Sequence, residues 1–194
     1  MKLVFATNNQ HKLHEIKHLL EDSFELLSLN DIECFDDIPE NQETIEGNAS
    51  EKAFYIWNKY QLNCFADDTG LEIEALNGEP GVYSARYAGD EKSPEKNIEL
   101  VLQKMAKIKN RKARFKTVIS LVIDGKEVQF EGIVEGTILE KKKGQSGFGY
   151  DPIFQPDESQ FSFAEMPLGE KNKISHRGRA TRKLVEYLTH LVHK

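Results

Sequence analysis

The chain reads Phe65-Ala66-Asp67-Asp68-Thr69-Gly70-Leu71-Glu72-Ile73-Glu74 at its most informative point. Two adjacent carboxylates stand there between a short apolar run and an alternating run, a pattern that predicts a strand, an acidic turn and a second strand. Carboxylates at the ends of strands can hold a hard cation such as Mg²⁺, and one of them can orient or deprotonate a water molecule. Turn chemistry alone would also explain Asp, Thr and Gly in succession, so these acids need partners from elsewhere in the chain.

A strand, a polar loop and a helix are predicted at the start of the chain. Lys2 to Ala6 is a short apolar run, residues 7–12 are polar, and Leu13 and Ile16 follow at helical spacing. Backbone N–H groups and the helix dipole favour an anion at such a helix N-terminus. Lys12 in the first turn is unfavourable against that dipole unless an anion lies nearby. An ordinary exposed lysine is the equally simple interpretation.

The same helix contains His14-Glu15-Ile16-Lys17-His18, which matches the H-E-x-x-H pattern of zinc proteases. Two histidines four residues apart on a helix could ligate zinc, with Glu15 as the base. The helix is short, a charged Lys17 stands within the motif, and no flanking pattern supplies a third ligand. The match is therefore interpreted as a coincidence on a solvated helix face.

Residues 25–29 predict a second strand, after which an acidic loop leads into a helix. Thr44 is the predicted N-cap of this helix, because apolar residues recur at steps of three and four from Ile45 onward. Glu40, just ahead of the helix, is either a metal ligand or part of a solvated acidic run. Composition alone favours the solvated run.

A further helix and a hairpin are predicted in the second half of the chain. Ser93-Pro94 is a helix start with serine as the cap and proline at the first position. Residues 115–123 and 128–139 have strand character and are joined at Asp124-Gly125, a hairpin turn signal. An antiparallel hairpin within an alternating strand and helix pattern predicts an α/β fold with a mixed sheet.

Two later stretches carry residues suited to an anionic ligand. Residues 141–152 are punctuated by glycines but contain neither a P-loop nor a G-x-G-x-x-G pattern, so those two nucleotide folds are not indicated. Phe148 between glycines could stack on a flat base or simply pack in a turn. Residues 169–178 predict a basic loop before a final amphipathic helix, and Lys171 and Arg177 in this loop suit phosphate or carbonyl oxygens.

Length and composition indicate one globular domain over residues 1–194, with room for two lobes. The net charge of −6 argues against a protein that coats a nucleic acid, and no apolar run approaches the roughly 18 residues of a membrane span. A cytoplasmic protein is the expected default. The two cysteines, Cys34 and Cys64, lie in apolar surroundings without metal-type spacing, so both are expected to be reduced packing residues.

Several stretches, in a fixed order through nearly the whole chain, carry a resemblance to a known family. They are Ala6-Thr7-Asn8-Asn9 with Lys12, Asn48-Ala49 with Lys52, Ala66-Asp67-Asp68-Thr69-Gly70-Leu71, Pro80-Gly81-Val82-Tyr83-Ser84-Ala85-Arg86-Tyr87, Gly147-Phe148-Gly149-Tyr150-Asp151-Pro152, Phe163-Ala164-Glu165-Met166 and Ser175-His176-Arg177-Gly178. In this order they resemble the inosine triphosphate pyrophosphatase family, house-cleaning enzymes that hydrolyse non-standard purine nucleoside triphosphates.

The resemblance implies that ITP, dITP or XTP is hydrolysed to the monophosphate and pyrophosphate, with Mg²⁺ as the cofactor. It also implies two lobes flanked by helices, an active site in the cleft between them, and a homodimer as the usual assembly. Asp68 is then the general base, Glu40 and Asp68 lie at the Mg²⁺ site, and Asp67 supports that site. The substrate-binding residues that the resemblance implies are Thr7, Asn8, Lys12, Lys52, Thr69, Phe148, Gly149, Tyr150, Asp151, Lys171, His176 and Arg177.

The implied base site has a physical basis for selection. Phe148 would stack on the purine, and His176 and Arg177 would lie near its 6-position. Hypoxanthine and xanthine carry a carbonyl acceptor there, whereas adenine carries an amino donor, so fixed donors at that edge would be left unpaired by adenine. The exclusion of guanine, which shares the carbonyl, does not follow from these residues.

The chain departs from the family pattern beside the second helix. Where relatives commonly carry Glu-Thr-Gly it has Glu40-Asn41-Gln42, and Gly47 stands where a glutamate is frequent. This departure leaves open how Glu40 reaches the metal.

Two other functions compete with the implied one. The first is a related nucleotide pyrophosphatase with a different base preference, for instance for modified pyrimidines, and the His176-Arg177 motif argues against it. A catalytically silent nucleotide-binding protein would not need the paired acids Asp67 and Asp68.

Overall fold

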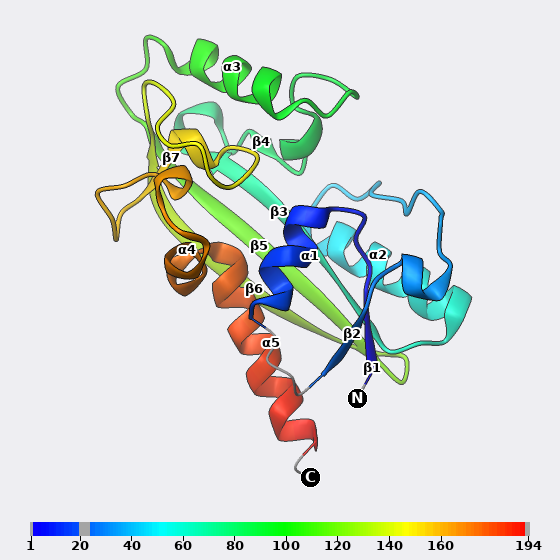
Figure 1. The fold of residues 1–194 in the computed structure, drawn as a ribbon. Helices are drawn as coiled ribbons and strands as arrows, with labels where there is room; N and C mark the ends of the chain where they lie inside the picture. Colours follow the sequence, from blue (N-terminus) through cyan, green and yellow to red (C-terminus); the bar gives the residue numbers. More distant parts are fainter. Residues whose placement is uncertain (1, 20–23, 193–194) are drawn as a thin grey trace. The chain divides into compact units, whose positions relative to one another are not determined.

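The computed structural model describes residues 2–19 and 24–192, which form a mixed α/β fold (Figure 1). The strands are β1 (Lys2–Phe5), β2 (Glu25–Leu27), β3 (Cys64–Ile73), β4 (Pro80–Gly81), β5 (Lys112–Ile123), β6 (Lys126–Ile138) and β7 (Phe154–Pro156). The helices are α1 (Gln10–Lys17), α2 (Ile45–Tyr60), α3 (Pro94–Met105), α4 (Leu168–Ile174) and α5 (His176–Val192). The strands are hydrogen-bonded in the order β2-β1-β3-β5-β6-β7, and β4 pairs with β3. Parallel and antiparallel pairs both occur, so the predicted α/β class with a mixed sheet is confirmed.

The chain gathers into two compact units. The first unit comprises residues 1–68, 117–132 and 177–194, and the second comprises residues 69–116 and 133–176. β3, β5 and β6 each begin in one unit and end in the other. The chain therefore passes between the units inside regular strands at these points.

The first unit is built on parallel strand pairs. Val4 of β1 is level with Leu27 of β2 and with Cys64 of β3. Phe5 and Phe65 stack with their ring centroids 4.6 Å apart. The buried cluster around these rings is Leu3, Phe5, Leu13, Ile16, Phe65, Ile119, Leu121, Phe130, Ala180, Leu184 and Leu188. The last three residues recur at intervals of four on α5, which gives that helix one apolar face.

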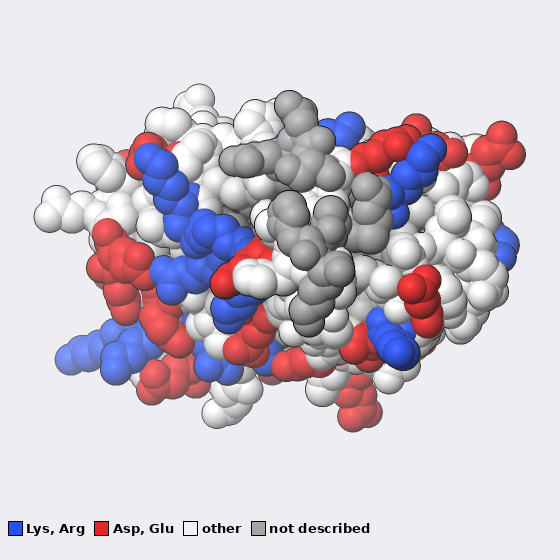
Figure 2. Space-filling view, turned by 90° about the horizontal axis from the view of Figure 1, so that it is seen from below, with Lys and Arg blue, Asp and Glu red and all other residues white. Residues whose placement is uncertain are grey.

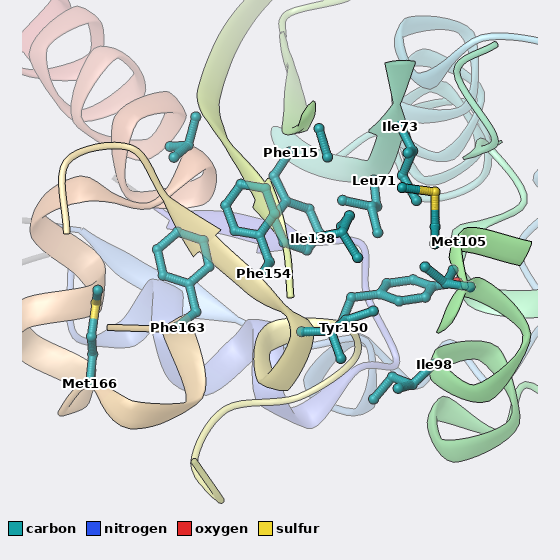
Figure 3. Packing of buried hydrophobic residues seen from close by; sticks show 14 residues of the cluster. Leu71, Ile73, Ile98, Met105, Phe115, Ile138, Tyr150, Phe154, Phe163 and Met166 are labelled. Carbon is teal, nitrogen blue, oxygen red and sulfur yellow. The ribbon is translucent and has the colours of Figure 1, made fainter. Parts of the chain in front are cut away.

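The second unit has its own aromatic core, drawn in Figure 3. Phe115 of β5 packs edge-on against Phe154 of β7 at a centroid distance of 4.7 Å, and Phe163 lies 5.3 Å from Phe154. Tyr150 belongs to the same buried cluster as Leu71 of β3. These rings pack the segment after the glycine-rich loop at residues 141–152 against β5.

Several local predictions are confirmed by the backbone. Thr44 caps α2 by accepting from the N–H of Gly47 at 3.0 Å, and Ser93 caps α3 by accepting from Lys96. Asp124 and Gly125 have φ values of 49° and 76°, the left-handed pair that a two-residue hairpin turn needs.

Two element predictions are wrong. Asp67, Asp68, Thr69 and Gly70 do not form a turn between two strands, because β3 runs unbroken from Cys64 to Ile73. Asp and Gly are poor strand formers, but partners distant in sequence hold the acids in the extended conformation. The predicted basic loop at residues 169–178 is largely helical, since α4 ends at Ile174 and α5 begins at His176.

Three general properties agree with the expectations from the composition. On the face drawn in Figure 2, Lys and Arg side chains are interspersed with Asp and Glu side chains. None of the described helices has the length and apolar character needed to cross a membrane. Cys34 and Cys64 are both buried and free, which confirms their prediction as reduced packing residues.

Candidate functional site

Asp67 is a buried carboxylate held by two cations of the first unit. Its relative exposure is 1%. Lys12 of α1 donates from Nζ to Oδ1 at 3.0 Å, and Arg177 of α5 donates from Nε to Oδ2 at 3.1 Å. Burial opposes ionisation, but Lys12, Arg177 and Lys52 outweigh it and hold the pKa of Asp67 below its usual range. The anion that Lys12 requires at the start of α1 is thus the protein's own carboxylate.

Arg177 links three elements of the first unit through carboxylates. Its guanidinium is 2% exposed and donates to Asp67 of β3 and to Glu15 of α1. Burial lowers the pKa of Arg177, but Glu15 and Asp67 raise it by more, so the net direction is upward. A planar guanidinium with five donors suits two carboxylates at once. The start of α5 is therefore tied to α1 and to β3.

Asp68 lies against α2, in surroundings unlike those of Asp67. Asn48 donates from Nδ2 to Oδ2 of Asp68 at 3.3 Å, and Lys52 lies 3.5 Å from Oδ1. Lys52 also donates to Oε1 of Glu40 at 2.5 Å. Burial raises the pKa of Asp68 despite the opposing effects of Lys52 and Lys12. Two neighbouring aspartates of one strand thus have pKa values displaced in opposite directions, an arrangement often found where one acid works and the other structures the site.

The residues predicted for the metal divide into two groups. Glu40 and Asp68 converge on one ammonium, that of Lys52, so two carboxylates face a single cationic position. Asp67 instead faces Lys12 and Arg177. Among residues 2–19 and 24–192, no group of three or more His, Cys, Asp and Glu side chains is arranged to hold a metal ion. Mg²⁺ commonly takes one or two protein carboxylates and completes its shell with substrate phosphates and water, so Glu40 and Asp68 fit this ion.

The start of α1 carries the other predicted phosphate residues. Thr7 is half-buried and Asn8 is exposed, and both precede the helix. Asn9 is the N-cap, and its Oδ1 accepts from the N–H groups of His11 and Lys12 at 3.0 and 3.2 Å. Sequence reasoning did not assign a role to Asn9, although asparagine just before a helical apolar pattern is a known cap signal.

The residues of the zinc-protease motif are partly exposed and partly buried. His14, Lys17 and His18 are exposed, as expected for a solvated helix face. Glu15 is 4% exposed and pairs with Arg177, so it was wrong to place this residue on the solvated face. The glutamate of the motif thus forms a buried ion pair with Arg177.

The second unit places an aromatic ring, a cation and a carboxylate together. Oδ2 of Asp151 accepts from Nζ of Lys171 at 2.7 Å and from the N–H of Phe148 at 2.9 Å. The Lys171 ammonium lies 5.0 Å from the centroid of the Phe148 ring, within cation–π range. A Cβ at Gly147 would lie 2.1 Å from Oδ2 of Asp151, so glycine is required there for the loop to approach the carboxylate.

Gly149, Tyr150 and His176, which are also predicted for the base site, lie in the same unit, whereas Arg177 belongs to the first unit. Tyr150 is buried and donates from its hydroxyl to the carbonyl oxygen of Ser84 at 2.8 Å, and Gly149 has a φ of 59°. His176 stacks on Phe115 at a centroid distance of 4.4 Å. Thr69 is half-buried in β3.

Two further residues of α2 face the loop that carries Glu40. Asn48 was quoted in the resemblance without a role, and Glu51 was not singled out. The useful signal was their helical spacing to Lys52, which places residues 48, 51 and 52 on one face.

Comparisons with known proteins agree over nearly the whole chain. The profile of the Ham1 family matches residues 3–187. A protein of Christiangramia forsetii named dITP/XTP pyrophosphatase is 59% identical over 97% of this chain and 100% of its own length. A protein of Flavobacterium johnsoniae with the same name is 56% identical over 97% of this chain and 98% of its own length. The solved structure of a HAM1 protein from Coxiella burnetii matches with a TM-score of 0.90 and 38% identity, over 98% of this chain and 99% of that one.

Proposed function

The chain belongs to the Ham1 family, and on that premise we propose that it hydrolyses the non-standard purine nucleoside triphosphates ITP, dITP and XTP. The products are the nucleoside monophosphate and pyrophosphate, so the reaction removes these nucleotides from the pool. The observation that carries the proposal is the cluster of Asp68, Lys52 and Glu40, in which two carboxylates converge on one cationic position. Binding alone would not need this arrangement.

Asp68 is the proposed general base. It takes a proton from a water molecule whose oxygen attacks the α-phosphorus, and the bond from that phosphorus to the oxygen bridging to the β-phosphate breaks. Pyrophosphate leaves with the bond electrons. The Asn48 amide holds the side chain of Asp68, so the carboxylate keeps one orientation toward the water. A positioned base of this kind contributes about 10²–10⁴ in rate.

The cations of the first unit are the proposed triphosphate ligands. Lys12 and Lys52, with Thr7 and Asn8 ahead of α1, would bind phosphate oxygens. Lys12 and Lys52 are each already paired with a carboxylate, so phosphate binding would exchange or share these partners.

Glu40 and Asp68 are the proposed Mg²⁺ ligands, with Asp67 in support. When bound, Mg²⁺ offsets phosphate charge as the water attacks. Asp67 would act by fixing Lys12 and Arg177, the two cations that it holds.

The second unit is proposed to bind the base. The ring of Phe148 would stack on the purine, with Gly149, Tyr150 and Asp151 shaping the pocket. Thr69 would supply a hydroxyl to the substrate. His176 would lie near the 6-position, where a fixed donor favours a carbonyl over an amino group.

We also propose that the protein works as a homodimer in the cytoplasm. Closed two-fold dimers are the commonest assembly of soluble chains. A mass in solution near twice the 22.2 kDa of one chain would support this, and a monomer mass at working concentrations would contradict it.

The direct test is hydrolysis of ITP, dITP and XTP against dATP, dGTP and dTTP with Mg²⁺, with pyrophosphate scored separately from phosphate. We expect pyrophosphate as the product and a strong preference for the first three substrates. Release of orthophosphate, or equal rates on dATP, would overturn the proposal. Preference for dTTP would favour a pyrimidine enzyme.

A further inference from the structure

The segment Glu40-Asn41-Gln42 is held along one face of α2. Lys52 binds the side chain of Glu40, Glu51 accepts from the N–H of Asn41 at 2.8 Å, and Asn48 accepts from the N–H of Gln42 at 2.9 Å. Three consecutive loop residues are therefore each bound to residues of the helix. The helix residues run in the opposite direction along the chain.

Glu51 makes a second contact to the same segment. Its Oε1 accepts from Nε2 of Gln42 at 3.3 Å, while Oε2 accepts from Asn41. A carboxylate that accepts two N–H donors makes charge-assisted bonds, which are stronger than those between neutral groups. Asn41 and Gln42 are exposed, so these hydrogen bonds compete with hydrogen bonds to water. We therefore expect them to order the loop rather than to stabilise the whole fold.

Gly47 makes room for this arrangement. A Cβ at residue 47 would lie 2.8 Å from Cβ of Gln42 and 3.0 Å from Oγ1 of Thr44. The two departures from the family pattern, Gln42 and Gly47, are thus spatially coupled. Gln42 supplies the amide that Glu51 binds, and Gly47 leaves space for its Cβ.

The other two helix contacts lead directly to Asp68. Asn48 binds Gln42 with its Oδ1 and Asp68 with its Nδ2, and Lys52 bridges Glu40 and Asp68. The position of the loop therefore sets the distance between Glu40 and Asp68. Glu51 acts on the loop residues that lie between these two bridges.

We propose that Glu51 is a positioning residue for the metal-binding pair: it holds Asn41 and Gln42 on α2 so that Glu40 stays opposite Asp68. This inference rests on the proposed function for its catalytic consequence. Its structural part, the ordering of residues 40–42 by Glu51, stands on the contacts alone.

The first experiment measures hydrogen exchange of the backbone amides in the whole protein without nucleotide. Glu51→Leu should speed exchange at Asn41 about tenfold, the effect of losing one hydrogen bond to a charged acceptor. Glu51→Gln should stay close to the wild type, because a flipped Gln42 amide can restore both bonds. Glu43→Leu is the matched control, since it removes an exposed glutamate of the same loop.

Exchange in α5 serves as the internal reference. Unchanged exchange at Asn41 in Glu51→Leu would overturn the proposal, and so would an equal rise throughout α5, which would mean general loosening of the fold.

The second experiment measures pyrophosphate release from dITP at increasing Mg²⁺. In Glu51→Leu the Mg²⁺ concentration at half-maximal rate should rise about fivefold, while the rate at saturating Mg²⁺ falls less than about twofold, as expected when binding rather than chemistry is weakened. Glu51→Gln and Glu43→Leu should match the wild type. An unchanged Mg²⁺ requirement in Glu51→Leu, despite faster exchange at Asn41, would overturn the positioning role.

The two proposals can fail separately. If the wild type releases no pyrophosphate from any nucleotide, the proposed function falls, and the exchange measurement still decides whether Glu51 orders the loop.

Discussion

Asp67 and Asp68 are adjacent on one strand, yet their surroundings give them different chemistry. Asp67 is enclosed by Lys12 and Arg177, so its negative charge is neutralised inside the protein. Asp68 has a neutral amide on one oxygen and shares Lys52 with Glu40 on the other. Because Asp68 is the less compensated carboxylate, it is the better proton acceptor of the pair.

Replacing Asp68 by asparagine tests this assignment. Asp68→Asn keeps the size and one acceptor oxygen but removes the basic carboxylate. We expect pyrophosphate release to fall by about 10²–10⁴ or more while the protein still folds, because a general base contributes on this scale. Steady-state rates and the thermal midpoint measure the two effects. Near wild-type rates would remove Asp68 from the role of base.

Cys64 gives a prediction that does not depend on function. Its thiol is buried, donates to the carbonyl oxygen of Ala53 at 3.2 Å, and has its pKa raised by burial to about 12. Iodoacetamide at about pH 8.5, near the ordinary thiol pKa, should label Cys64 in urea but not in the native protein.

The sign of the pH effect at Cys64 follows from proton binding. Above about pH 8.5 the unfolded chain loses the thiol proton that the folded chain keeps, so the free energy of unfolding should fall as pH rises toward 12. Rapid native labelling of Cys64 at pH 8.5 would contradict the burial described.

At the scale of elements, α2 and the loop ahead of it must be compatible in shape. Gly47 lies in a helix, where alanine normally stabilises by about 1 kcal/mol relative to glycine. In this chain the added Cβ would meet Gln42, at a distance that real Cβ atoms do not reach without a shift. Steric overlap and helix propensity therefore oppose each other at one position.

A double-mutant cycle separates these effects. Gly47→Ala alone should lower the free energy of unfolding by about 1–3 kcal/mol, as overpacking does. In a Gln42→Gly background the same change should cost less, because the contact with Gln42 is gone and only the 3.0 Å contact with Oγ1 of Thr44 opposes helix propensity. Urea denaturation of the four proteins gives the coupling. Stabilisation by Gly47→Ala in the presence of Gln42 would contradict the described contact.

Arg177 joins α1, β3 and α5, and its removal tests how these elements depend on one another. Arg177→Met removes the guanidinium that both Glu15 and Asp67 share and leaves their two carboxylates buried without it. We therefore expect the free energy of unfolding to fall by about 3–5 kcal/mol. The thermal midpoint of a chain of this length should then fall by roughly 6–20 °C. Adding Glu15→Gln should recover part of the loss, since one buried charge is removed.

Arg182→Met is the control for this variant, because Arg182 is exposed on the same helix. Its effect should be much smaller than that of Arg177→Met, because exposed charged side chains contribute less to stability than buried ones. Equal effects of the two arginine variants would mean that the buried ion network does not contribute to stability.

Elements governed by local signals were predictable from sequence. The Thr44 and Ser93 caps and the Asp124-Gly125 turn depend on residues within a few positions, and each is present. The error at residues 67–70 arose because local preference indicated a turn, whereas Lys12 and Arg177 hold Asp67 in the strand from 55 and 110 residues away. The basic stretch near residue 171 was misassigned for the same reason, since Lys171 and Arg177 are buried against carboxylates.

The site shows the same division between local and distant information. The resemblance supplied Asp68, Lys52 and Glu40, which the structure brings together. It could not supply Glu51, whose role depends on Gln42 and Gly47, two residues in which this chain departs from the pattern. Contacts that are particular to one chain do not follow from the pattern of its family.

At the scale of the whole molecule, two compact units share three strands. β3, β5 and β6 each contribute residues to both units, and each unit has its own buried cluster. A unit that unfolded alone would have to end three ladders in mid-strand and expose their backbone groups. We therefore propose that residues 1–194 behave as a single cooperative domain.

Unfolding in urea should accordingly show one transition by probes placed in either unit. Trp57, the single tryptophan, reports on the first unit by fluorescence, and hydrogen exchange of α3 reports on the second. Coincident midpoints and equal m-values are expected for a two-state domain. Separate midpoints would show that shared strands do not couple the units, and the chain would then count as two domains. The Arg177→Met variant sharpens the test, because its loss arises in the first unit and should lower both midpoints equally if the units unfold together.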